Sequence, residues 1–134
     1  METDLIIATI NELHQKANTA LTHKDASNYM ADFDESLTYT RADGIKIGIK
    51  EYTTEMERYL RRIKKIETSQ YRIKSSFHED IFTEKIARKS IIIKPKMLVF
   101  SKKQTIQTEE IYHWKNINGK WKIIIVEIVL EEKY

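Results

Sequence analysis

The sequence TIQTEEIYHWKNINGKWKIIIVEIVL, residues 105–130, contains two apolar-rich segments on either side of the pair Asn118–Gly119. Asn and Gly tolerate the positive φ angles that a two-residue turn requires. Both segments are long enough, and rich enough in β-branched and aromatic residues, to form strands. We therefore predict an antiparallel hairpin with strands at residues 105–115 and 121–130.

The second of these strands carries apolar side chains on both of its faces. With strict alternation, one face holds Trp121, Ile123, Ile125 and Val129, and the other holds Ile124, Val126, Ile128 and Leu130. A strand with one wet face would alternate apolar and polar residues, so both faces need cover. Helices can cover one face. We expect a second copy of the chain to cover the other, as a homodimer built sheet to sheet, and the alternative is an N-terminal helix or loop wrapped over it.

The two-residue period extends toward the N-terminus as far as residue 67. One strand face is formed by Tyr71, Ile73, Ser75 and Phe77. Residues 86–100 are again rich in β-forming residues, but Pro95 interrupts them and cannot donate a hydrogen bond to a neighbouring strand. We predict a bulge or an edge position at Pro95, and a hairpin tip at Lys102–Lys103.

The N-terminal half shows helical spacing instead. A first helix presents one apolar face made by Leu5, Ile6, Ile10, Leu13, Ala17, Ala20 and Leu21. Asp25 caps a short second helix that extends to Phe33, and a hairpin turns at Asp43–Gly44 before a long helix over residues 49–66. Helices followed by a run of antiparallel strands indicate the α+β class, with the helices packed on one face of the sheet. The length of 134 residues suits a single domain, 1–134.

The composition excludes several classes of protein. The chain has no Cys, so it has no disulfide, no thiolate metal site and no Cys nucleophile. No apolar run approaches the length of a membrane span, and the first residues lack the basic flank of a signal peptide. We therefore expect a cytoplasmic protein with no membrane partner.

The net charge of +3 is small, and the densest basic stretch lies on one predicted helix. Arg58, Arg61, Arg62, Lys64 and Lys65 fall mostly opposite its apolar positions. A solvated helix face explains them better than a phosphate-binding stripe, so we expect no nucleic-acid partner. The four His residues show no metal-ligand spacing and there is no phosphate-binding loop, so no metal and no cofactor are expected.

Two stretches resemble the nuclear transport factor 2-like superfamily, the SnoaL-like and ketosteroid isomerase-like proteins. The first is KDASNYMADF (residues 24–33) followed by Leu37-Thr38-Tyr39 and Asp43-Gly44. The second is EEIYHW (residues 109–114) followed by Asn118-Gly119-Lys120-Trp121, whose spacing is similar to the association domain of calcium/calmodulin-dependent kinase II. The resemblance implies a cystatin-like cone, in which a curved antiparallel sheet wraps the N-terminal helices and leaves a pocket open at one end.

The superfamily includes isomerases, cyclases, dehydratases, ligand binders and assembly domains, so the fold does not choose among functions. Steroid-isomerase chemistry needs a carboxylate base and two oxyanion donors. The resemblance places Ala17, Arg41 and Ile111 at those positions, and none of them can do this work. The kinase-association family often has His at two positions of its last strand, where this chain has Ile125 and Glu127.

Two residues are candidates for acid–base catalysis. His113 shares a strand face with Glu109, and its ordinary pKa near 6.5 suits proton transfer if that face lines the pocket. The alternative is a hydrogen-bonded His at the dimer surface or rim. Glu127 interrupts an apolar strand, and burying an unpaired carboxylate is costly. It should therefore meet a cation, Arg41, Arg88 or a partner-chain Lys, or else face the pocket.

The remaining candidates are pocket-lining residues: Tyr29, Phe33, Tyr39, Tyr59, Phe77, Glu109 and Ile111. Most of the aromatic members also suit an ordinary core. The expected function is binding of an apolar or aromatic small molecule in an apolar pocket by a homodimer. The alternatives are a SnoaL-like isomerase, cyclase or dehydratase that uses His113 or Glu127, and a protein-assembly module.

Overall fold

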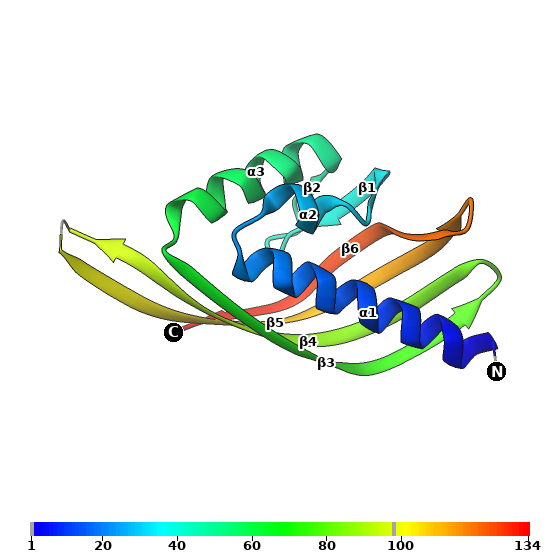
Figure 1. The fold of residues 1–134 in the computed structure, drawn as a ribbon. Coiled ribbons are helices and arrows are strands. Elements are labelled where there is room, and N and C mark those ends of the chain that lie inside the picture. The colour runs from blue at the N-terminus through cyan, green and yellow to red at the C-terminus, as the bar shows by residue number, and fades with distance from the viewer. Residues whose placement is uncertain (1, 98) are drawn as a thin grey trace.

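The computed structural model describes residues 2–97 and 99–134, which form a layer of helices on a layer of strands (Figure 1). The helices are α1 (Glu2–Thr22), α2 (Ala26–Met30) and α3 (Ile49–Arg62). The strands are β1 (Phe33–Thr40), β2 (Lys46–Ile47), β3 (Lys65–His78), β4 (Ile81–Lys96), β5 (Phe100–Ile117) and β6 (Lys120–Lys133). No helix among the described residues is both long enough and apolar enough to cross a bilayer.

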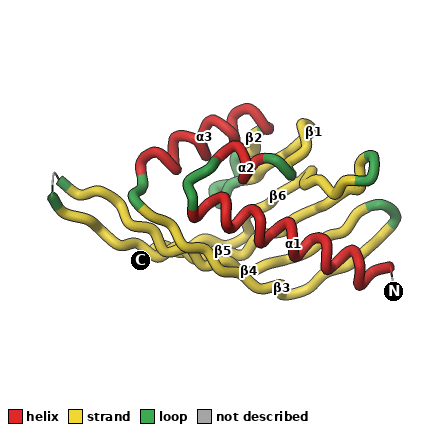
Figure 2. The backbone as a smooth tube through the Cα atoms, viewed as in Figure 1, coloured by secondary structure: helices red, strands yellow, loops and turns green. Residues whose placement is uncertain are grey.

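The strands form one curved sheet in the order β2-β1-β6-β5-β4-β3, and the helices lie on its concave side (Figure 2). β3 to β6 make the expected antiparallel meander, with long registers such as Phe82↔Trp114. β1, however, pairs with β6 in parallel, with Tyr39 opposite Val126. The predicted α+β class with helices on one face of a curved sheet is confirmed, and the sheet is mixed rather than wholly antiparallel.

The core lies between the helices and the concave face. α1 buries one stripe that includes Ile10 and Leu21, because residues three and four apart share a helix face. β4 alternates, so that Phe82, Ile86 and Ile92 are buried. These side chains join α1 to the middle of the sheet.

β6 contains two bulges, and they change which side chains face the helices. The pairing of β6 with β5 slips at Ile124 and again at Val129. Each extra residue reverses the alternation that follows it. As a result Ile123, Val126 and Ile128 are all buried. The strict alternation predicted for this strand is wrong, and the outer face carries Ile125 and Leu130.

Other boundaries also differ from the predictions. Lys102 lies within β5, opposite Lys94, so the predicted hairpin tip at Lys102–Lys103 is wrong; β4 ends at Lys96 and β5 begins at Phe100. Pro95 sits beyond the last β3 pair, where it needs no partner on that side, as an edge position requires. α3 ends at Arg62 because Ile63 is extended and buried, which turns the chain into β3.

Candidate functional site

A hollow of about 130 Å³ lies inside the cone, between the helices and the concave face. Tyrosines from several elements surround it: Tyr29 of α2, Tyr39 of β1, Tyr52 and Tyr59 of α3, and Tyr112 of β5. Arg88, Thr108 and Glu110 of the sheet also line it. The interior therefore combines aromatic walls with a small polar floor.

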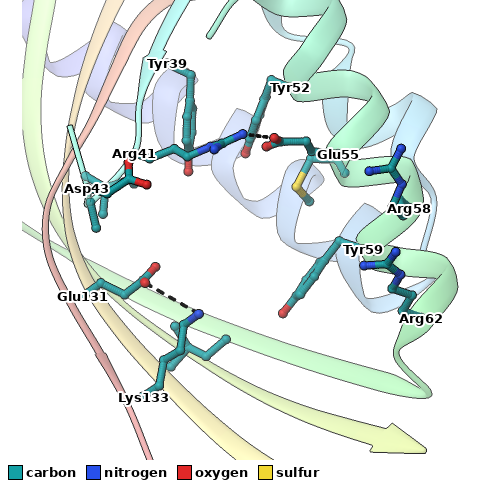
Figure 3. Close-up of a pocket in the computed structure, with 14 residues that line it drawn as sticks. Tyr39, Arg41, Asp43, Tyr52, Glu55, Arg58, Tyr59, Arg62, Glu131 and Lys133 are labelled. Carbon is teal, nitrogen blue, oxygen red and sulfur yellow. Dashed lines mark hydrogen bonds and ion pairs between the residues drawn. The ribbon is translucent and has the colours of Figure 1, made fainter. Parts of the chain in front are cut away.

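A wider hollow of about 780 Å³ adjoins this interior one (Figure 3). Both hollows are lined by the same five side chains, Tyr39, Tyr52, Met56, Tyr59 and Ile106, which we call the throat. Figure 3 shows α3 on one side of the opening and the end of β6 on the other, with Tyr59 projecting between them. The throat side chains therefore lie between the wider hollow and the interior one that holds the polar floor.

The tyrosines of the interior hold one another in place. The rings of Tyr39 and Tyr52 stack with centroids 4.1 Å apart, and the hydroxyls of Tyr29 and Tyr52 lie 2.9 Å apart. Burial raises the pKa of all three phenols. Their hydroxyls therefore stay protonated at neutral pH and can donate hydrogen bonds.

The floor is a charge-paired cluster on neighbouring strands. Arg88 Nε donates to Glu110 Oε1 at 3.2 Å, and the hydroxyl of Tyr112 donates to the same oxygen at 2.9 Å. Thr108 donates to Glu110 Oε2 at 2.6 Å, and Arg88 also bonds Asn18 of α1. Burial by itself lowers the pKa of Arg88, but Glu110 together with the surrounding tyrosines outweighs burial and the pKa rises. Arg88 is therefore held in its charged form beside the Glu110 carboxylate, and both groups also bond other side chains.

Charged side chains surround the opening, but most are neutralised locally. Arg41 forms an ion pair with Glu55, and Lys133 lies 3.7 Å from Glu131 (Figure 3). Arg58 and Arg62 project from α3 beside them. The opening is thus polar, with a small excess of positive charge.

A second buried polar cluster joins α1 to the sheet. His14 Nε2 lies 2.7 Å from Glu84 Oε2, and the indole of Trp114 donates to that same oxygen at 2.7 Å. Arg72 Nε donates to the other oxygen of Glu84 at 2.9 Å. Three donors around one buried carboxylate make this cluster a structural tie.

The residues predicted to line the pocket fall into two groups. Tyr29, Tyr39 and Tyr59 line the interior. Phe33 is buried beside Tyr29, with ring centroids 5.4 Å apart, and belongs to the core. Phe77 lies away from both hollows, near the end of β3 and against Trp121.

Glu109, Ile111, His113 and Glu127 lie on the outer face of the sheet. The strand alternates, so the burial of Glu110, Tyr112 and Trp114 directs their neighbours outward. Glu109 pairs there with Lys85 at 3.1 Å. The prediction that Glu109 and Ile111 line the pocket is therefore wrong, because the other side of β5 faces the helices, and the condition for His113 to act inside the pocket is not met.

On that outer face, His113 Nδ1 lies 3.2 Å from Thr83 Oγ1. Partial burial lowers the pKa of His113, against the opposing charge of Glu127. Glu127 itself is exposed and meets neither Arg41 nor Arg88, which lie on the other side of the sheet. The geometry thus favours the surface interpretation of His113 over an interior base.

Sequence reasoning missed the floor residues Arg88, Glu110 and Tyr112. One signal pointed to them, since Tyr112 and Trp114 are the largest side chains of their strand and share a face with Glu110. Large aromatic side chains usually face a core. Within the described residues, no group of three or more His, Asp or Glu side chains is arranged to hold a metal ion.

No family model matches the chain, and neither does any curated protein. Solved structures do match. A proposed scytalone dehydratase from Novosphingobium aromaticivorans is 14% identical, with a TM-score of 0.83 over 99% of this chain and 91% of that one. A domain from Nostoc punctiforme, described as having a cystatin-like fold, is 12% identical, with a TM-score of 0.70 over 90% and 74%.

A third structure bears on the resemblance of the last hairpin. It is a proposed calcium/calmodulin-dependent protein kinase II association domain from Xanthomonas campestris, 15% identical, with a TM-score of 0.70 over 89% of this chain and 83% of that one. Identities this low carry the fold and not the activity. The helices on the concave side of a curved sheet and these structural matches together show that the chain has a cystatin-like fold.

Proposed function

We propose that the protein binds an aromatic small molecule inside the cone, through the throat. The observation that supports this proposal is that the same five side chains line both the outer hollow and the interior one. Stacked tyrosines offer flat apolar faces, and their protonated hydroxyls offer donors. The matching ligand is flat, apolar over most of its surface and equipped with hydrogen-bond acceptors at one end.

The same cone supports acid–base catalysis less well. Both oxygens of Glu110 accept hydrogen bonds from protein groups, so this carboxylate is not free to take a proton from a ligand. His113 and Glu127 lie on the outer face. Because one structural match is named as a dehydratase, an enzyme is our second candidate function. The hydrogen-bonded Glu110 of the floor supports ligand binding better than catalysis.

The throat gives a direct test with the fluorescent probe anilinonaphthalene sulfonate, an aromatic anion. Met56→Trp fills the throat, and we expect probe affinity to fall at least about tenfold, as steric exclusion from a small apolar site typically causes. Leu5→Trp adds the same ring at an exposed position of α1, away from both hollows, and serves as the matched control. Equal probe binding by the parent and both variants would contradict the proposal.

We further propose that the protein is a homodimer that pairs through the outer face of the sheet. Ile125 and Leu130 expose apolar surface there, and Leu130 is 46% exposed. Exposed apolar surface gathered on one face is typical of interfaces. Light scattering should therefore give twice 15.9 kDa for the parent.

Leu130→Lys should shift that mass toward the monomer, because a charge buried between two apolar faces is costly. Leu5→Lys is the matched control, since Leu5 is 70% exposed on α1, away from the sheet's outer face. A parent mass of 15.9 kDa at high concentration, or dissociation by both variants alike, would exclude this dimer.

A further inference from the structure

The β4–β5 hairpin extends well beyond the rest of the sheet (Figure 1). β3 stops pairing with β4 at Ile93, and β6 stops pairing with β5 at Ile106. Tyr134 adds one more pair of backbone hydrogen bonds, to Thr105. From Lys94 to Gln104 the two strands therefore pair only with one another, as a free ribbon that projects from the end of the cone.

The tip of this ribbon exposes large apolar side chains. Met97 is 79% exposed, Val99 80% and Phe100 60%. Leu98 lies outside the described residues. Single exposed apolar residues are ordinary, but three at one projecting tip form a patch that favours a partner.

The apolar tip is surrounded by positive charge. Lys94, Lys96, Lys102 and Lys103 all lie on the ribbon, and the ribbon sequence contains no Asp or Glu. Lys94 is directly opposite Lys102, and like charges placed opposite one another destabilise a strand pair. An anionic surface would relieve that repulsion.

We propose that the ribbon tip inserts into the headgroup region of a membrane that contains anionic lipids. The lysines would meet lipid phosphates and carboxylates, while Met97, Val99 and Phe100 would reach the acyl boundary. The sequence predicted no membrane partner because no segment spans a bilayer, but surface insertion needs no span. The proposal concerns a surface separate from the throat.

The observations favour a membrane over two other occupants. A nucleic acid would satisfy the lysines and leave the apolar tip in water. A second copy of this tip would bury the apolar side chains but bring eight lysines together at one interface. Only a surface that is negative outside and apolar beneath fits both halves of the ribbon.

The test is co-sedimentation of the full chain with vesicles of phosphatidylserine and phosphatidylcholine in equal parts, against phosphatidylcholine alone. We expect binding to the anionic vesicles only, weakened by added salt. Each lysine near an anionic bilayer contributes roughly fivefold in affinity. Lys96→Glu/Lys102→Glu should therefore bind at least about 25-fold more weakly. Lys102→Glu also places an opposite charge beside Lys94, which preserves the ribbon.

Two further variants make the result specific. Val99→Ser/Phe100→Ser removes the insertion and should also lose most of the binding, with the lysines intact. Lys115→Glu/Lys120→Glu carries the same charge change at the exposed β5–β6 turn, at the opposite end of the sheet, and should bind as the parent does apart from the small effect of net charge.

Several results would overturn the proposal. One is no binding to anionic vesicles at low salt. Another is equal loss in the ribbon and control lysine variants, which would indicate only a net-charge effect. A third is full binding by Val99→Ser/Phe100→Ser together with equally salt-sensitive binding to duplex DNA, which would assign the ribbon to polyanions in general.

Discussion

Glu84→Gln is expected to lower the free energy of unfolding by about 3–5 kcal/mol, the usual effect of breaking a buried charge cluster. Glu84 is almost fully buried, and it accepts hydrogen bonds from Arg72 and Trp114 beside His14. Gln keeps the shape of the side chain but removes the negative charge that Arg72 faces. It also turns an amide donor toward groups that are donors themselves.

Urea unfolding, followed by tryptophan fluorescence, measures this change. Glu109→Gln is the matched control, because Glu109 is partly exposed and pairs with Lys85 on the outer face. Its effect should stay within about 1 kcal/mol, as for other surface ion pairs. Similar losses in the two variants would mean that the cluster does not tie α1 to the sheet.

The contribution of Glu84 also depends on pH. Burial by itself raises the pKa of the Glu84 carboxyl, but the hydrogen bond and charge of His14, with Trp114 and Arg72, outweigh burial and lower it. The stabilisation is therefore complete above the unfolded-chain pKa of about 4.3 and is lost as the pH falls through the folded-state pKa. Below about pH 5, the parent should lose stability with falling pH more steeply than Glu84→Gln does.

The second large effect is expected at the floor of the cone. Arg88→Met should cost about 3–5 kcal/mol, because it leaves the buried Glu110 carboxylate without its cation. Arg88→Met/Glu110→Leu should cost much less than the sum of the two single changes, since apolar pairs often replace buried ion pairs at little cost.

A double-mutant cycle by urea unfolding measures this coupling. The equivalent cycle on Lys85 and Glu109 of the outer face provides the control, because those partners are partly exposed. Additive effects of Arg88→Met and Glu110→Leu would show that the two residues stabilise the fold independently. The floor would then not act as one charge-paired unit.

The sequence allows most of the fold to be predicted, because it depends on patterns that many residues repeat. The apolar stripe at residues 5–21 fits only a helix, and the Asn118–Gly119 pair fits only a tight turn between strands. The bulges of β6 are different, since nothing in the run Ile123-Ile124-Ile125 distinguishes an extra residue from a regular strand. Only the pairing with β5 places them.

The candidate site depends on one further choice, the parity of β5. Glu109 and Glu110 are neighbours, so they point to opposite faces of the sheet. One face carries Glu109 with His113, and the other carries Glu110 with Tyr112. The catalytic hypothesis depended on the face of β5 that carries His113 pointing into the pocket. In the structure, Trp114 packs against α1, and its face carries Glu110 inward. A residue type that suits chemistry does not by itself say which way a strand faces.

The parallel pairing of β1 with β6 has a consequence for synthesis on the ribosome. β1 is made early, but its long neighbour in the sheet is β6, and Ile123 of β6 bonds the carbonyl of Asp32. Until β6 emerges, both β1 and β5 present bare edges that can join strands of other nascent chains. The sheet therefore closes only after β6 is translated, and until then the exposed strand edges favour pairing with other chains.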